Sequence, residues 1–148
     1  MLAKIAAFTE AHRPLSGRSF LQVDSSASPP LKAAQAIASV VEHALETVPC
    51  AAVFVPTRMG TTARLISRFR GAVWIVALCG EPAACQNLAF SYGVHAIHLA
   101  QEPDDWRQLM RAWVRENRLP GSVAMLVTGP SPRNPEGNYR LEFMRVGH

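Results

Sequence analysis

The sequence predicts an α/β fold, a three-layer α/β/α sandwich around a mixed sheet of about five strands with the last strand antiparallel. Beyond residue 50, short apolar runs alternate with segments of helical periodicity. The run at residues 73–78 is apolar throughout, which is typical of a parallel strand covered on both faces. The last connection, residues 128–138, contains three prolines and two glycines and is too short for a helical crossover. The final strand is therefore expected to run antiparallel to the strand before it.

Residues 1–30 are expected to form an N-terminal helix and a connector, ahead of an α/β domain at residues 31–148. With 148 residues, the chain is long enough for one domain with a substantial core. Residues 2–10 place apolar side chains on one face of a helix, and Pro14 lies just beyond its end. Residues 16–30 are rich in serine, glycine and proline, which indicates an irregular connector.

A long helix is expected to open the α/β domain. Ser28 is a candidate cap, and Pro29 and Pro30 fit the first turn, where a missing N–H group costs no hydrogen bond. Apolar residues then recur at helical spacing up to Leu45, and Pro49 ends the helix. The many alanines in this stretch predict that the helix packs closely on the sheet.

Strands and helices alternate in the rest of the chain. Strands are expected at residues 51–55, 73–78, 94–99, 123–127 and 141–146. Helices are expected at residues 61–69, 83–92 and 104–117. Gly93 fits the stop of the second of these helices, and Asp104 and Asp105 stand at the start of the third as cap and first-turn residues.

The loop after the first strand is the main candidate for a binding site, because ligands in open α/β sheets bind beyond the carboxyl ends of the strands. This loop combines hydroxyl groups, one cation and a permissive glycine. The residues are Thr57, Arg58, Gly60, Thr61 and Thr62. The N–H groups at the start of the following helix also attract anions. The alternative interpretation is that Thr61 or Thr62 simply caps that helix.

The loop at residues 128–138 follows another strand at the same edge and carries Arg133. It would either help to hold an anion opposite the first loop or serve as an ordinary proline-stiffened linker. The net charge of +4 suits a small phosphorylated ligand. The arginines are scattered across the expected helices, and neither a basic stripe nor aromatic stacking positions are apparent, so no nucleic-acid partner is expected. No apolar run spans a bilayer and no signal peptide is recognisable, so we expect no membrane partner and a cytoplasmic location.

Catalytic and metal-binding motifs are not apparent in the sequence. The three cysteines and five histidines show no metal-ligand spacing, and neither a metal nor a cofactor is expected. There is no P-loop lysine, dinucleotide-binding glycine motif or serine–histidine–acid order. Cys79 or His95 would be the candidates if the chain were an independent enzyme. Trp106 and Trp113 share one helix face, where core packing is the first interpretation and the wall of a ligand pocket the second.

The segment Val53–Arg70 resembles part of the C-terminal domain of pyruvate kinase. In that family an apolar strand leads into a threonine- and serine-containing loop, a glycine and a helix that ends in Arg-Tyr/Phe-Arg, as Ser67–Arg70 does here. Residues 1–14 are similar to the segment that joins the catalytic barrel of the family to this domain. Other similar segments are Trp74–Ala77, Ala84–Ala89, Tyr92–Val94, Val127–Gly129 and Met144–Val146.

The resemblance implies a mixed five-stranded α/β/α sandwich with a site for an allosteric sugar phosphate, often fructose 1,6-bisphosphate. The family's phosphate-holding loop corresponds to Thr57–Thr62. Met59 stands where the family often has a hydroxyl residue, so one hydrogen bond to the phosphate is lost.

The resemblance also implies a second group of residues near the effector. Trp106 is similar to a tryptophan that borders the second phosphate, and Arg107 and Arg111 are candidates for an arginine beside it. Residues 130–138, which include Arg133, resemble the flap that closes over the effector. This segment ends in Pro-Glu-Gly-Asn, at residues 135–138, where the family commonly has a Gly-Gly/Thr-Asn ending.

Catalysis in this family takes place in a barrel domain, which typically needs ~250 residues. A chain of 148 residues has no room for it, so no phosphoryl transfer is expected from this chain alone. The resemblance leaves a catalytic barrel, in a longer or a separate chain, as a partner. It also implies a homo-oligomer, because the domain contributes to a subunit interface. The alternative function is a structural or oligomerisation module whose effector site has decayed.

Overall fold

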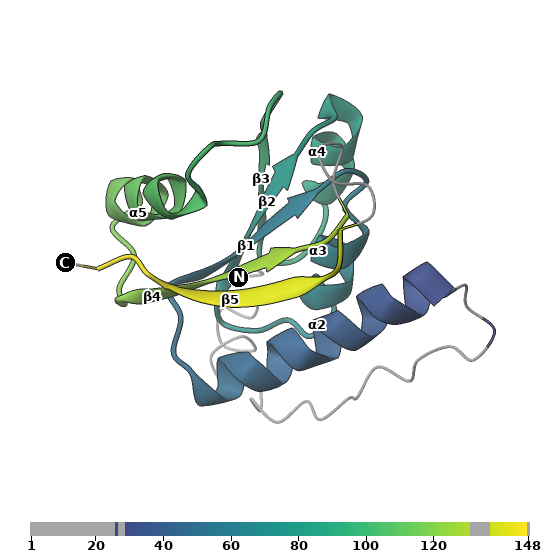
Figure 1. Cartoon of the computed structure of the whole chain (residues 1–148), viewed down its shortest axis with the longest axis horizontal. Coiled ribbons are helices and arrows are strands. Elements are labelled where there is room, and N and C mark those ends of the chain that lie inside the picture. Colours follow the sequence, from purple (N-terminus) through teal and green to yellow (C-terminus); the bar gives the residue numbers. More distant parts are fainter. Residues whose placement is uncertain (1–25, 27–28, 131–136, 148) are drawn as a thin grey trace, which may run out of the picture.

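A five-stranded sheet with helices on both faces forms the domain (Figure 1). The computed structural model describes residue 26, residues 29–130 and residues 137–147. The predicted N-terminal helix, most of the predicted connector and Arg133 lie outside the described residues.

The strands lie side by side in the order β3-β2-β1-β4-β5. Their bounds are β1 Ala52–Thr57, β2 Trp74–Cys79, β3 Val94–His98, β4 Val123–Thr128 and β5 Arg140–Arg145. β1 pairs in parallel with both β2 and β4, and β2 pairs in parallel with β3. β5 is antiparallel to β4. The predicted α/β fold, with a mixed sheet and an antiparallel last strand, is therefore confirmed.

The described helices are α2 Pro29–Thr47, α3 Thr61–Ser67, α4 Pro82–Leu88 and α5 Trp106–Glu116. The largest difference from the sequence prediction is in α4, which ends at Leu88 and does not continue to residue 92. Phe90, just past this end, is 94% exposed, so residues beyond Leu88 have no apolar face to bury. Gly93 then takes a left-handed φ of 67° as the chain turns into β3. Within the described ranges, no helix has the length and apolar character needed to cross a membrane.

Two apolar cores, one on each face of the sheet, hold the layers together. Val53 and Val55 of β1 point into the core beneath α2, α3 and α4. Phe54 points into the core beneath α5, where its ring meets the ring of Trp113 edge to face with centroids 5.6 Å apart. Trp106 packs against the same core, so core packing is confirmed for both tryptophans. The alternation along β1 is the period-2 pattern of a strand buried on both sides.

The start of α5 is capped by Asp105, as the sequence predicts. Its carboxylate accepts hydrogen bonds from the N–H groups of Arg107 at 2.9 Å and Gln108 at 3.2 Å. We expect Asp105→Ala to lower the free energy of unfolding by about 1 kcal/mol, because two first-turn N–H groups lose their acceptor. Asp105→Asn keeps an oxygen acceptor and is expected to be nearly neutral. Urea unfolding followed by circular dichroism compares the two variants, and equal losses of stability would contradict the capping role.

Candidate functional site

The loop between β1 and α3 is held in a tight turn by Thr57 and Gly60. The N–H group of Gly60 donates a hydrogen bond to Thr57 Oγ1 at 2.8 Å. Gly60 adopts a left-handed φ of 83° and is itself the cap residue of α3. Because glycine has no side chain, α3 begins without a side-chain cap from this residue. The interpretation of Thr61 or Thr62 as the cap is therefore wrong. Both residues lie inside the helix, because the turn closed by Thr57 starts the helix earlier.

A pocket of about 190 Å³ lies between this loop and the residues that follow β4. We call it the loop pocket. Its lining residues are Pro56, Thr57, Arg58, Met59, Thr61, Thr62, Val127, Thr128, Gly129, Pro130 and Tyr139. Threonine hydroxyls, a guanidinium and apolar side chains therefore border the same space, at the carboxyl ends of the adjacent strands β1 and β4.

Most of the residues predicted to hold a phosphate line the loop pocket. They are Thr57, Arg58, Thr61 and Thr62. Gly60 does not line the pocket and is buried. A Cβ atom placed on Gly60 would lie 3.0 Å from the side chain of Leu88 in α4. Gly60 therefore shapes the loop, while its neighbours present their side chains to the pocket.

The wall opposite this loop includes Gly129 and Tyr139. The ring of Tyr139 lies directly on Gly129, since a Cβ atom at position 129 would be only 2.8 Å from Cε1 of the ring. Thr128 at the end of β4 pairs with Arg140 at the start of β5, which brings the residue before β5 to the pocket. Sequence reasoning missed Tyr139. The predicted antiparallel pairing was the signal that could have found it.

Arg58 makes an ion pair with Glu81, which precedes α4. Arg58 Nε lies 3.4 Å from Glu81 Oε1, and the two side chains are 72% and 50% exposed. The loops that carry them are neighbours because Thr57 pairs with Cys79 across β1 and β2. The N–H group of Gly80 also donates to the carbonyl oxygen of Thr57 at 3.4 Å. Sequence reasoning missed Glu81, although adjacent parallel strands place their following loops side by side.

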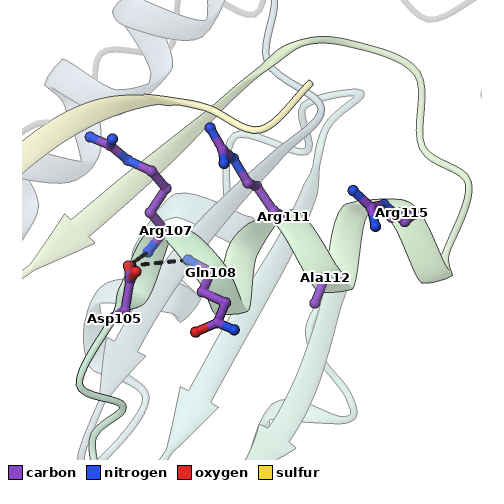
Figure 2. A pocket seen from close by; sticks show the side chains of 6 residues that line it. All are labelled: Asp105, Arg107, Gln108, Arg111, Ala112 and Arg115. Atoms are coloured by element: carbon purple, nitrogen blue, oxygen red, sulfur yellow. Dashed lines mark hydrogen bonds between the residues drawn. The ribbon is translucent and has the colours of Figure 1, made fainter. Parts of the chain in front are cut away.

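The residues predicted to border a second phosphate do not line the loop pocket. Arg107 and Arg111 lie with Arg115 along the exposed face of α5, around a separate hollow of about 390 Å³ (Figure 2). Arg111 Nε donates to the backbone carbonyl oxygen of Arg145, at the end of β5, at 3.3 Å. Trp106 packs against the core beneath α5. A role for these residues beside a phosphate therefore stays a prediction.

The arrangement of Cys79 and His95 does not suit nucleophilic catalysis. Burial of Cys79, together with its hydrogen bond to Cys85, raises the pKa of the Cys79 thiol to about 12. Such a thiol carries almost no thiolate at neutral pH. Cys79 belongs to the core beneath α3 and α4, whereas His95 lies beside Trp113 on the other face of the sheet, with ring centroids 5.7 Å apart. Within the described ranges, no three histidine, cysteine or acidic side chains gather to hold a metal ion.

Comparisons with known proteins agree on one family. The family described as "Pyruvate kinase, alpha/beta domain" matches residues 35–145. A pyruvate kinase from Thermococcus litoralis is 42% identical over 96 residues, which cover 64% of this chain and 20% of the relative. The chain therefore spans about a fifth of that curated relative.

Solved structures show the same fold at lower identity. A Cryptosporidium parvum pyruvate kinase in complex with ADP matches with a TM-score of 0.67 and 24% identity, over 86% of this chain and 26% of that chain. Another crystal structure of a pyruvate kinase from this organism matches with a TM-score of 0.73 and 20% identity, over 98% and 29% of the two chains.

Proposed function

This chain belongs to the pyruvate kinase α/β-domain family, and on that basis we propose that it is a regulatory module that binds a phosphorylated metabolite at the loop pocket. The ligand class is a sugar phosphate, held by Arg58 and the threonines of the Thr57–Thr62 loop. The module does not transfer phosphoryl groups by itself and works beside a catalytic barrel. Pyruvate formed from phosphoenolpyruvate and ADP by the purified chain would overturn the non-catalytic part of this proposal.

The observation that carries the proposal is the gathering of a guanidinium and several hydroxyls around the loop pocket. The side chain of Arg58 is 72% exposed, and Thr61 and Thr62 are partly exposed, so a solute can reach all three. Guanidinium and hydroxyl groups are suitable donors to phosphate oxygens. Because α3 has only seven residues, these side chains, more than the end of the helix, are expected to supply the binding energy.

The loop pocket suits one phosphoryl group better than two. Its volume of about 190 Å³ is below the ~300 Å³ at which pockets for drug-sized ligands begin. Among the described residues that line it, only Arg58 has a cationic side chain. A sugar monophosphate is therefore the ligand that we favour. Fructose 1,6-bisphosphate would need a further set of donors for its second phosphate.

Isothermal titration calorimetry of the whole chain with glucose 6-phosphate, fructose 1,6-bisphosphate and AMP tests the proposal. We expect Arg58→Gln to raise the Kd of the bound phosphate about tenfold or more, because a charge-assisted hydrogen bond is lost. Arg64→Gln removes the same charge from an exposed position on α3 that does not line the pocket, and it is expected to leave the Kd unchanged. Absence of binding by all three ligands would overturn the proposed site.

The second candidate function is an oligomerisation module, and the edge strand β5 favours it. β5 pairs with β4 on one side only within the described sheet, and Phe143 on this strand is 46% exposed. An edge strand with an exposed aromatic side chain can pair with a second copy of the chain. A dimer whose population rises with protein concentration, together with no binding of phosphorylated metabolites, would support this function over the first.

A further inference from the structure

Glu81 brings a negative charge to the edge of the loop pocket. Its Oε1 atom lies 3.4 Å from Nε of Arg58. This guanidinium is the group on which the proposed phosphate binding depends most. The contact joins the loops that follow β1 and β2, and the hydrogen bond from Gly80 N–H to Thr57 O runs between the same loops. When a ligand anion approaches Arg58, the guanidinium is therefore already paired with the carboxylate of Glu81.

The position of Glu81 is not explained by helix capping. Glu81 is the cap residue of α4, yet its side chain accepts no N–H group from that helix. Asp105, in the same position at the start of α5, accepts two. The pair of Glu81 with Arg58 is exposed on both sides, and exposed ion pairs contribute little to folding stability. We therefore expect Glu81 to affect the binding of ligands to Arg58 more than it affects the stability of the fold.

We propose that Glu81 is a built-in competitor that sets the affinity and the charge selectivity of the loop pocket. This inference rests on the function proposed above. A phosphate and the carboxylate of Glu81 are both acceptors for the guanidinium of Arg58, so a ligand must displace Glu81 to bind. A dianionic phosphate has more charge and one more acceptor oxygen than a carboxylate, and it can displace Glu81. A carboxylate ligand offers Arg58 only what Glu81 already supplies.

The expected consequence is selectivity for phosphorylated over carboxylated metabolites. In Glu81→Gln the guanidinium of Arg58 has a neighbour of the same size as before, but this neighbour no longer carries a negative charge that competes with the ligand. We expect this variant to bind glucose 6-phosphate with a Kd about two- to fivefold lower than that of the unmodified chain, because an exposed pair is weak. We also expect the preference for glucose 6-phosphate over succinate to decrease. In this variant a carboxylate of succinate no longer has to displace the equivalent carboxylate of Glu81 from Arg58.

Calorimetry on the whole chain with these two ligands measures both effects. Glu46→Gln is the matched control, since it removes one carboxylate from an exposed pair with His43, near the end of α2. That helix ends shortly before β1 begins, whereas Glu81 follows the carboxyl end of β2. The control is expected to bind both ligands as the unmodified chain does. Thermal unfolding of each variant, measured without ligand, shows whether the fold is retained.

The double variant Arg58→Gln/Glu81→Gln shows whether the effect passes through Arg58. We expect the gain produced by Glu81→Gln to be largely lost in the Arg58→Gln background. Equal affinities for glucose 6-phosphate in Glu81→Gln and the unmodified chain would overturn the competition while leaving the proposed site intact. Failure of every variant to bind would overturn the proposed function itself, and this inference with it. Binding of glucose 6-phosphate by the unmodified chain, with a lower Kd in Glu81→Gln, would support both.

Discussion

Phe54→Ala is expected to lower the free energy of unfolding by about 3–5 kcal/mol, the range for an aromatic residue removed from a core. Phe54 is fully buried in β1, a strand with β2 on one side and β4 on the other. Its ring meets Trp113 edge to face, so the substitution also removes an aromatic contact between the sheet and α5. The substitution would leave a cavity in the middle of the core beneath α5. Because this core is close-packed, the sheet and the helix can close the cavity only in part.

Urea unfolding followed by circular dichroism measures this loss. Phe90→Ala is the matched control, because it makes the same chemical change at a side chain that is 94% exposed. We expect the control to change the free energy of unfolding by about 0.5 kcal/mol or less. Similar losses in the two variants would contradict the assignment of Phe54 to the core.

The second large effect is expected for Gly60→Ala, which should lower the free energy of unfolding by about 2 kcal/mol. An L-residue at a φ of 83° is strained by about 1–2 kcal/mol. The added Cβ atom would also lie 3.0 Å from the side chain of Leu88, so α4 would have to give way. Because the Gly60 N–H group closes the turn on Thr57, the same change is expected to weaken phosphate binding at the loop pocket.

Gly80→Ala provides the control for this prediction. Gly80 lies in the loop after β2, its φ is not left-handed, and a Cβ atom there would have no neighbour within 4 Å. We expect Gly80→Ala to have little effect on the urea midpoint, while Gly60→Ala lowers it clearly. If both glycines tolerated alanine equally, the turn would not need the left-handed conformation.

Much of the fold could be predicted from the sequence because it depends on local patterns. The apolar run at residues 73–78 predicted a strand covered on both faces, and Ile75 and Val76 of β2 do point into opposite cores. The short proline-rich connection before β5 predicted an antiparallel strand, which the pairing with β4 confirms. The end of α4 at Leu88 was not predicted, since helical periodicity does not reveal which turn loses contact with the core.

The candidate site was harder to predict because it depends on which loops become neighbours. The run from Thr57 to Thr62 was identified from its composition alone. Glu81 and Tyr139 come close to it only through the pairing of β1 with β2 and of β4 with β5. Conversely, Arg107 and Arg111 were assigned to the site by resemblance, and the structure places them around another hollow, on α5. Local sequence shows which side chains are suitable, whereas strand order decides which of them meet.

The strand order β3-β2-β1-β4-β5 has a consequence for the synthesis of the chain. A ribosome finishes β1, β2 and β3 long before it reaches Val123, where β4 begins. Until then one side of β1 has no partner strand, and its N–H and C=O groups can pair with a neighbouring nascent chain. Truncated products that stop before β4 are therefore expected to aggregate, because the second neighbour of β1 is made only after β2 and β3.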